Sequence, residues 1–397
     1  MKMALKVLES FDEAETFSVV WDDLVMRTDT DIYQTFDWCR IWWRHYGQGR
    51  RLQLLLGFSD DRLVGVMPLF TEILWLMPVR IRVAKLVGSD FSLQFCNLAI
   101  EEAYLQVFIE SAVRRFLCES SCDLLLLGPL SGPSAKVDEI LAAVERMDVF
   151  VQEAESLGSG CATRFELPPD FASYLKEIGS RQRGNYSRAM KQWADGCQIK
   201  VDIVRTAKEV RDEFEHFVVL HEGQWRQEGK LGHFGDWPRA MAFNRDLVEY
   251  LSEQNKVRFH RILADGMVAT SQYCLVHNGV IYWRLPARVN NLEWEKLGLG
   301  KVGLVKMVEG SIAEGIGIID GGRGHYDYKV QLGAREWPLR TVQIMRPGAT
   351  VWLRVKLFRT FARWLNLAYY KIFFIRLAPR FSWLRHSLWS TWIRSTW

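Results

Sequence analysis

The stretch that decides the fold is Val280-Ile-Tyr-Trp-Arg-Leu-Pro286, followed by Gly298-Leu-Gly-Lys-Val-Gly303 and then by Asp320. Three glycines at this spacing, with an acid about twenty residues later, match the dinucleotide-binding fingerprint. That fingerprint requires a buried strand that runs directly into the glycine turn, with further βα units after it. Here the strand is instead the second arm of a hairpin turned by Asn278-Gly279, the strongest short hairpin signal, and no βα unit follows Asp320. The segment therefore predicts an antiparallel meander that leads into a phosphate-binding helix, the glycine-helix.

Helix and strand patterns follow a similar order in the two halves of the chain. The first half reads as helix 35–46, hairpin 51–70, strand 80–87, helix 101–117, strand 124–127, helix 135–147 and strands near 149 and 163. The second half reads as helix 171–193, strand 199–204, helices 207–227 and 236–254, hairpins 256–289, helix 299–314 and strand 317–320. Such mixtures indicate an α+β protein with mixed, mainly antiparallel sheets. Two prolines in Leu167-Pro-Pro-Asp170 exclude helix, so we expect domains at 1–168 and 169–345 and a tail at 346–397.

Composition excludes several classes of protein. With 25% charged and 49% hydrophobic residues in 397, the chain suits two globular domains rather than a disordered protein. The seven cysteines are scattered, form no CxxC pair and have no neighbouring histidines, which argues against a disulfide framework and against a metal site. We therefore expect a reducing, cytoplasmic setting. The sequence shows no GxSxG or HExxH motif, so a hydrolase lacks support.

Several motifs occur together over roughly residues 30–335. They are Phe36-Asp-Trp38, Val87-Gly-Ser-Asp90-Phe91, the basic stretch Ser180-Arg-Gln-Arg-Gly-Asn-Tyr-Ser-Arg188, His221-Glu222…Trp225, the glycine-helix, and Asp320…Gly324…Tyr328-Lys329…Gly333. In these motifs the chain resembles the GNAT-like acyltransferases of the CelD/BcsL family, associated with cellulose and exopolysaccharide biosynthesis. More distantly it is similar to the FemABX peptidyltransferases. The resemblance implies two tandem GNAT-like domains, the second of which binds acyl-CoA.

The start of the glycine-helix is the candidate cofactor site. A helix N-terminus offers unpaired N–H groups and the positive end of the helix dipole, which suit the pyrophosphate of acyl-CoA or, in the simplest case, acetyl-CoA. We assign cofactor binding to Leu297, Gly298, Leu299, Gly300 and Lys301. The alternative is a glycine-rich helix start that binds no ligand.

The segment 320–333, the closing loop, carries the candidate catalytic groups. Acyl transfer from a thioester requires a deprotonated nucleophile, stabilisation of the oxyanion and a proton for the leaving thiolate. Asp320 ends the strand beside the glycine-helix, and His325 is the loop side chain with a reference pKa near neutral. Tyr328 could protonate the thiolate, and Lys329 could stabilise negative charge. The structural alternative is that Asp320 bonds its own loop amides and that the loop rings are packed or solvated.

Four further residues are candidates for substrate binding. Arg183 and Arg188 lie within about two turns of one helix, a spacing that suits phosphates, although a solvated basic face has the same pattern. Asp90 and Trp225, from the resemblance, could line an acceptor cleft between the domains. For Trp225 a place in the core is the alternative.

The tail has an unusual charge. Residues 346–397 contain ten Lys/Arg and no acid, so residues 1–345 carry −6 while the whole chain carries +4. A helical wheel of 353–372 places Leu357, Phe361, Trp364, Leu365, Ala368 and Ile372 opposite Lys356, Arg359 and Arg363. This pattern predicts peripheral binding of residues 351–397 to an anionic membrane surface. Alternatively the helix packs on the enzyme; no recognisable fold supports nucleic-acid binding.

Together these observations predict a cytoplasmic acyltransferase, peripheral on the inner face of the membrane. It would move an acyl group, acetyl in the simplest case, from acyl-CoA to an amine or hydroxyl of a sugar or lipid-linked glycan precursor. One alternative is a FemABX-like transferase with an aminoacyl-tRNA donor. Another is a non-catalytic GNAT-like scaffold at the membrane.

Overall fold

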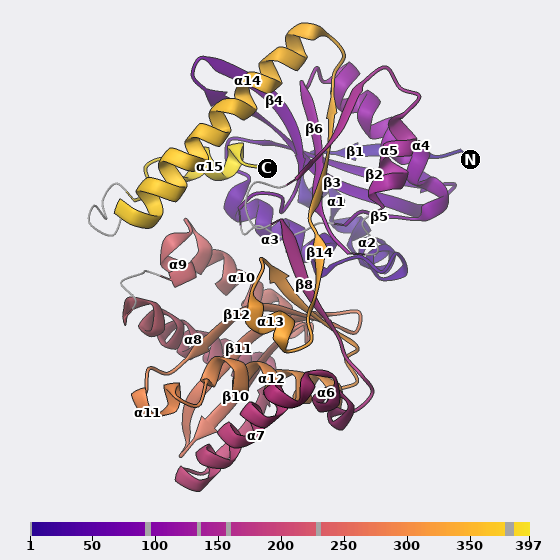
Figure 1. Cartoon of the computed structure of the whole chain (residues 1–397). Coiled ribbons are helices and arrows are strands. Elements are labelled where there is room, and N and C mark those ends of the chain that lie inside the picture. The colour runs from indigo at the N-terminus through magenta and orange to yellow at the C-terminus, as the bar shows by residue number, and fades with distance from the viewer. Residues whose placement is uncertain (1, 92–96, 133–135, 156–159, 228–231, 378–384) are drawn as a thin grey trace. The chain divides into compact units, whose positions relative to one another are not determined.

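A computed structural model describes residues 2–91, 97–132, 136–155, 160–227, 232–377 and 385–397. The chain forms two compact units (Figure 1). The first unit comprises Met1–Gly160 and Pro338–Trp397, and the second comprises Cys161–Trp337. Both are mixtures of helices with a mixed sheet, which confirms the predicted α+β class.

The first unit is built on an 8-stranded sheet in the order β1-β2-β3-β4-β6-β15-β7, with β5 paired to β3. Its strands are β1 (Ala4–Leu8), β2 (Arg51–Ser59), β3 (Arg62–Leu76), β4 (Val79–Leu86), β5 (Ala99–Ile100), β6 (Leu124–Leu130), β7 (Phe150–Glu155) and β15 (Arg340–Met345). Its helices are α1 (Phe11–Ala14), η1 (Glu15–Phe17), α2 (Ser18–Arg27), η2 (Ile32–Gln34), α3 (Phe36–Tyr46), η3 (Glu102–Tyr104), α4 (Leu105–Val113), η4 (Arg114–Glu119), α5 (Val137–Val144), α14 (Ala349–Leu365), η5 (Asn366–Leu377) and α15 (Trp389–Ser395). β4 and β6 pair in parallel, whereas the other pairs are antiparallel.

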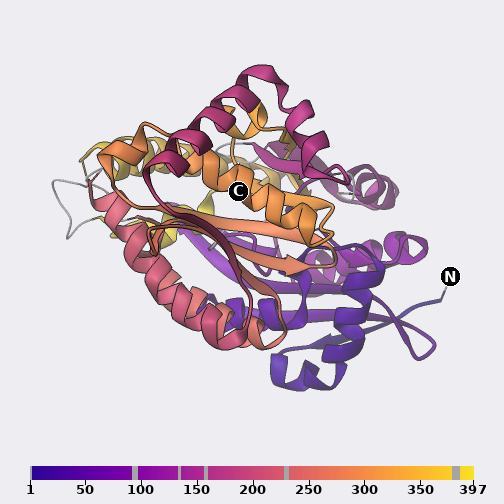
Figure 2. The ribbon, with the colours of Figure 1, turned by 90° about the horizontal axis from the view of Figure 1, so that it is seen from below.

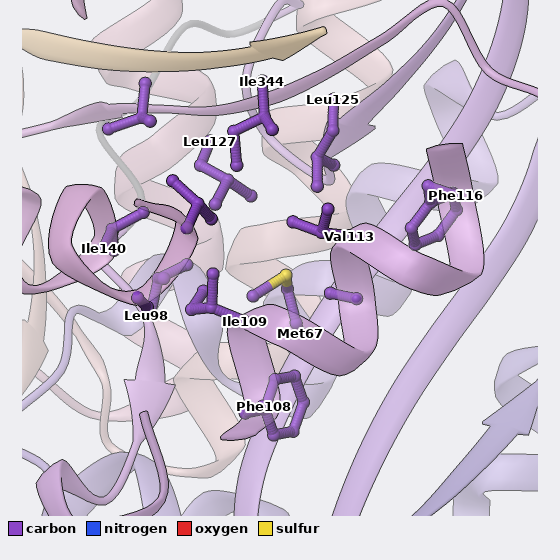
Figure 3. Close-up of a cluster of buried hydrophobic side chains, with 14 of the residues drawn as sticks. Met67, Leu98, Phe108, Ile109, Val113, Phe116, Leu125, Leu127, Ile140 and Ile344 are labelled. Carbon is purple, nitrogen blue, oxygen red and sulfur yellow. The ribbon is translucent and has the colours of Figure 1, made fainter. Parts of the chain in front are cut away.

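Helices α4 and α5 cover one face of this sheet. Figure 3 shows Leu125 and Leu127 of β6 and Ile344 of β15 directed toward Ile109 and Val113 of α4. All five side chains are fully buried. Because β15 supplies part of this cluster, the first unit needs residues from beyond the second unit to complete its core.

Helix α14 packs in a second cluster of the first unit (Figure 1). Its inward side chains are Val351, Val355, Phe358 and Ala362, which pack with Ile81 and Val83 of β4 and with Leu124 and Leu126 of β6. The prediction of a separate tail at 346–397 was therefore wrong, and the alternative of a helix that packs on the enzyme holds for this face. Residues 378–384 of the segment lie outside the described residues.

The second unit is built on a 7-stranded sheet in the order β14-β8-β13-β12-β11-β10-β9. Its strands are β8 (Cys161–Glu166), β9 (Ile199–Val204), β10 (Val257–Ala264), β11 (Met267–His277), β12 (Val280–Arg288), β13 (Ile318–Arg323) and β14 (Arg335–Pro338). Its helices are α6 (Phe171–Glu177), α7 (Gly179–Gly196), α8 (Ala207–Gln227), α9 (Gly232–Asp236), α10 (Ala240–Glu253), α11 (Leu292–Glu295), α12 (Leu299–Ala313) and α13 (Asp327–Gln331). The predicted boundary at 168/169 falls at 160/161 instead, because β8 pairs with β13.

The meander and the glycine-helix form as predicted. Asn278 and Gly279 have φ angles of 47° and 72°, the two positive values that a type I′ hairpin turn requires. Figure 2 shows the orange glycine-helix α12 and the magenta α7 on one side of the orange strands, with the salmon α8 and α10 on the other. The helix predicted at 171–193 is interrupted at Gly179, which has φ of 77°. The helix predicted to begin at 236 begins at Ala240, just after Pro238.

Candidate functional site: the fork between strands β12 and β13

The central feature of the second unit is a place where its sheet divides. β12 and β13 pair in parallel at Val280–Ile318, Ile281–Ile319 and Tyr282–Asp320, and their pairing stops there. Beyond that point β12 continues along β11 and β13 continues along β8. β12 also contains an extra residue, because Tyr273 and Cys274 face Leu285 and Trp283 and leave Arg284 unpaired in the ladder. We call the space beyond Tyr282 and Asp320 the second fork.

Lys329 places its ammonium group in the second fork. The Nζ atom donates a hydrogen bond to the carbonyl of Gly321 on β13 at 2.5 Å. It also lies 5.0 Å from the ring centroid of Trp283 on β12 and 4.6 Å from that of Tyr326. The residue is only 6% exposed, and this burial lowers the pKa of Lys329 to about 8, although the charge of Asp320 opposes the shift.

Asp320 and Tyr328 lie near this lysine with different surroundings. Asp320 is buried, and its Oδ1 atom accepts a hydrogen bond from the backbone amide of Gly322 at 2.7 Å. This is the loop-bonding role that the structural alternative proposed. Tyr328 is half-buried against the core, and burial raises the pKa of its phenol to about 12. Tyr328 is therefore protonated at neutral pH and can donate a hydrogen bond or a proton.

His325 is in a different environment from the other three residues. Its side chain is 59% exposed and lies between Glu336, at 2.6 Å from Nδ1, and Asp327, at 3.0 Å from Nε2. Hydrogen bonds to these two carboxylates raise the pKa of His325, Glu336 contributing most. The structure thus gives His325 the role of fastening the exposed side of the loop, because its neighbours stabilise the charged form rather than a free base.

A pocket of about 380 Å³ opens at the start of α12. Its lining comes from the two sides of the glycine turn, from the facing side of α7 and from the residue after α13: Gln182, Asn185, Tyr186, Arg188, Ala189, Gln192, Lys296, Leu297, Gly298, Lys301, Val302, Val305 and Leu332. The pocket therefore brings together three basic residues, Arg188, Lys296 and Lys301, around one helix N-terminus. Leu332 links it to the short helix that carries Tyr328 and Lys329.

The structure explains why two positions of the motif, 298 and 303, are glycine. Gly298 caps the helix with φ of 69°, a left-handed conformation that other residues adopt at a cost. At Gly303 an added Cβ would lie 2.7 Å from Nε2 of Gln272 and 3.0 Å from Oγ1 of Thr270, so glycine permits close packing of α12 on β11. At Gly300 an added Cβ would meet nothing closer than Arg288 at 3.8 Å. The motif thus combines a turn glycine and a packing glycine.

Some of the predicted binding residues line the pocket and others do not. Leu297, Gly298, Lys301 and Arg188 line the pocket. The pocket lining does not include Leu299, whose side chain is buried in the core, or Gly300. Arg183 points elsewhere and donates to the carbonyl of Leu175 at 3.3 Å.

Asp90 and Trp225 both contact other side chains of their own unit in ways that stabilise the fold. Asp90 belongs to the first unit, is 2% exposed, and is bound by Arg50 at 2.7 Å. The positive charges of Arg50 and Lys85 hold the pKa of this carboxyl below its usual value. Trp225 is half-buried, with its ring 6.1 Å from that of buried His221. His221 contacts the carbonyl of Pro286 at 2.9 Å, and burial lowers its pKa to about 4, so a neutral ring holds α8 to β12.

Some residues that line the pocket were not predicted from the sequence, although their spacing could have indicated them. Gln182, Tyr186, Ala189 and Gln192 recur at helical spacing and form one face of α7. Leu332 of the pocket, and Arg284 at the bulge of β12 outside it, gave no such signal, because both depend on which strands and loops meet. Within the described ranges, no group of three or more His, Cys, Asp or Glu residues is placed to hold a metal ion. Nor does any helix in those ranges have the length and apolar character needed to cross a membrane.

The part of the chain that carries the fork, the helix N-terminus and the pocket is similar to acyltransferases of the GNAT type. Residues 180–330 match the family model described as Acetyltransferase (GNAT) domain, a range that covers the glycine-helix and the fork. No curated protein matches the chain. The narrower CelD/BcsL family stays a prediction.

The whole fold is similar to solved structures. FemX shares 11% identity over 86% of this chain and 97% of its own, with a TM-score of 0.59. The C-terminal domain of a protein described as a lysylphosphatidylglycerol synthetase from Agrobacterium fabrum shares 11% identity over 88% of this chain and 96% of its own, with a TM-score of 0.51. At these identities the likeness concerns the fold, and it extends over both units.

Proposed function

We propose that the protein transfers an acyl group, acetyl in the simplest case, from acyl-CoA to an amine or hydroxyl of a sugar or lipid-linked glycan precursor. The observation that supports acyl-CoA as the donor is the pocket at the N-terminus of α12, where Arg188, Lys296 and Lys301 surround the glycine turn. The acceptor class and a role in polysaccharide biosynthesis rest on the resemblance to the CelD/BcsL family.

The pocket has the chemistry that a nucleotide pyrophosphate needs. The amides at the start of α12 and its dipole favour negative charge, and the left-handed Gly298 leaves the backbone open to close approach. Lys296 precedes the glycine turn and Lys301 lies in the first turn of α12, whereas Arg188 comes from α7. Positive charge from two separate elements would hold the phosphates, while Val302, Val305 and Leu332 offer an apolar path for the pantetheine arm.

In the second fork, Lys329 and Tyr328 carry the proposed chemistry. With a pKa of about 8, Lys329 is mostly protonated at neutral pH, and its buried ammonium can stabilise negative charge that develops on the thioester oxygen or the leaving thiolate. Tyr328 remains protonated and can donate to the thiolate. Asp320 acts on Lys329 by favouring its charged form. His325 lies outside this set because it is exposed and paired with carboxylates.

Calorimetric titration of the full chain with acetyl-CoA tests the donor. Lys301→Glu should weaken binding by ~10-fold or more, because it reverses a charge at the helix N-terminus. Lys200→Glu is the matched control, since Lys200 is exposed on β9 of the same unit and does not line the pocket. Equal losses in both variants, or no binding by the parent protein, would contradict the proposal.

An aminoacyl transferase is the second candidate, favoured by the TM-score of 0.59 to FemX over nearly the full length of both chains. The resemblance to the FemABX group implies an aminoacyl-tRNA donor for such an enzyme. Competition between acetyl-CoA and a charged tRNA for the parent protein separates the two. Binding of the tRNA alone, insensitive to Lys301→Glu, would favour the second candidate.

A further inference from the structure

Helix α14 is apolar on two opposite sides. Val351, Val355, Phe358 and Ala362 are at most 5% exposed and pack in the first unit. The opposite side carries a second row of large apolar side chains, Leu353, Leu357 and Trp364, and Leu367 and Ile372 follow in η5. At about 100° per residue the three residues on α14 fall within about 40° of arc. We call these five residues the outer stripe.

The outer stripe faces solvent. Its members are between 43% and 64% exposed, with Trp364 the most exposed. Packing on the sheet accounts for the inner face of α14, but it gives no reason for apolar residues on the outer face. Single exposed apolar residues are ordinary, whereas a row along more than three helical turns indicates a surface that something covers.

The basic residues of the segment divide into two groups. Arg346 and Arg354 pair with Asp123, and Arg394 pairs with Glu72, so these three tie the segment to the first unit. Lys356, Arg363 and Lys371 are exposed; the first two fall along one flank of the outer stripe on α14, and Lys371 follows in η5. Among the described residues, no carboxylate pairs with these three.

We propose that the outer stripe with its basic flank docks the protein on the surface of an anionic lipid bilayer, with α14 lying in the interface plane. Both the apolar row and the basic flank are complementary to such a surface. The apolar row and Trp364 suit the boundary between headgroups and acyl chains, and long basic side chains can extend to anionic headgroups beside it. Because residues 346–397 contain no acid, nothing in the segment repels such a surface. The proposed orientation differs from the predicted wheel, since Phe361 and Leu365 are half-buried rather than outermost.

Co-sedimentation of the full chain with vesicles tests the proposal. Vesicles of phosphatidylcholine with about a third phosphatidylglycerol should bind the protein, and pure phosphatidylcholine vesicles should bind it at least ~10-fold less. Leu357→Glu with Trp364→Glu should lower binding to the anionic vesicles by ~10-fold or more, because it places charge in the row. Neutralising Lys356, Arg363 and Lys371 to Gln should lower it by ~100-fold, at about fivefold per basic residue, and should flatten the salt dependence.

Val19→Glu is the matched control, because Val19 is also an exposed apolar residue of the first unit but lies on α2, outside the hollow that Leu353 and Leu357 line. It should leave vesicle binding unchanged. Equal binding to neutral and anionic vesicles, or equal loss in the control, would overturn the proposal. So would a dimer that Trp364→Glu converts to a monomer without any vesicle binding, since the stripe would then cover a second copy. All variants change exposed residues, and an unchanged melting temperature verifies that they fold.

Discussion

The two units contain the same arrangement, a parallel strand pair joined by a crossover helix, with opposite charge at the helix start. In the first unit β4 and β6 pair from Val83–Leu124 to Lys85–Leu126, and the crossover helix begins at Glu101 and Glu102. Glu101 is bound by arginines, at 3.1 Å by Arg27 and 2.5 Å by Arg62. In the second unit α12 begins behind Lys296 and Gly298. At the first helix start the nearby arginines are bound by Glu101, whereas at the second Lys296 and Lys301 border a pocket, so the second helix start is the one that offers positive charge to a phosphate.

The pairing of β4 with β6 ends at Lys85 and Leu126, and we call the space beyond these residues the first fork. The lysines of the first and second forks also have contrasting partners. Lys85 of the first unit lies 2.8 Å from Glu72 and donates to the carbonyl of Arg394 in α15 at 2.5 Å. Arg50 joins the same buried carboxylates, Glu72 and Asp90. Lys329 of the second unit meets a carbonyl and two aromatic rings instead. The same topology therefore holds a C-terminal helix in one unit and leaves an ammonium available for chemistry in the other.

Truncation after Met345 should have the largest effect, because it removes what fills the first fork. It deletes four buried side chains of α14 and the Arg394 partner of Glu72. We expect the first unit to lose more than ~5 kcal/mol of stability, which calorimetry would show as a lost unfolding transition. Trp364→Ala, an exposed change in the same segment, should leave the melting temperature within a degree or two. An intact transition in the truncated protein would mean that α14 is not core.

Lys329→Met should lower kcat by ~100- to 10,000-fold without loss of stability, since it removes a positioned charge from the reaction and a buried charge from the fold. Lys85→Met makes the same change in the first fork. It should instead cost about 3–5 kcal/mol of stability, because Glu72 loses a buried partner, and the folded fraction should keep its specific activity. Chemical denaturation and acetyl-transfer assays on both variants measure the contrast. Identical behaviour of the two variants would remove the distinction between the forks.

Gly298→Ala should weaken binding of acetyl-CoA by ~10-fold, because alanine disfavours the left-handed cap and narrows the approach to the helix N-terminus. Gly266→Ala supplies the control. Gly266 has φ of 79° in the β10–β11 turn of the same unit, with nothing within 4 Å of an added Cβ, so its strain is comparable. Titration calorimetry should show weakening only in the first variant. A similar loss in both would trace the effect to general strain.

The smallest expected effect is on pH dependence. Lys329 must be charged in the proposed mechanism, so kcat/KM should fall as pH rises through about 8, by about twofold at pH 8 and tenfold at pH 9. Stability should change in the opposite sense. Between about 8 and 10.5 the unfolded chain binds the proton that the folded lysine has lost, so this residue makes stability rise with pH there. A rate that rises through pH 8 would make Lys329 a base instead.

Local patterns predicted the elements of the second unit well. The Asn278-Gly279 turn, helix 207–227 and the glycine-helix all form at or within a residue of the expected positions, because turn chemistry and helical periodicity are encoded in adjacent residues. The start of the candidate pocket, at Leu297, Gly298 and Lys301, was likewise accessible from its motif.

The remainder depended on pairings between distant segments. β15 was not predicted, since Arg340–Met345 becomes a strand by pairing with β6 and β7, about 200 residues earlier in the chain. The same distance concealed the return of residues 338–397 to the first unit. Asp90 and His325 were misleading for a related reason. A charged residue in a motif looks the same in sequence whether it faces a substrate or, as here, Arg50 or Glu336.

The place of β15 has a consequence for biosynthesis. Because this strand lies between β6 and β7, the sheet that contains the N-terminal strands is incomplete until residues 340–345 have left the ribosome. The second unit, Cys161–Trp337, is continuous and can fold as soon as it emerges. The segment translated first is therefore expected to finish folding last, and during translation its unpaired β6 and β7 edges are the part of the nascent chain most in need of a chaperone.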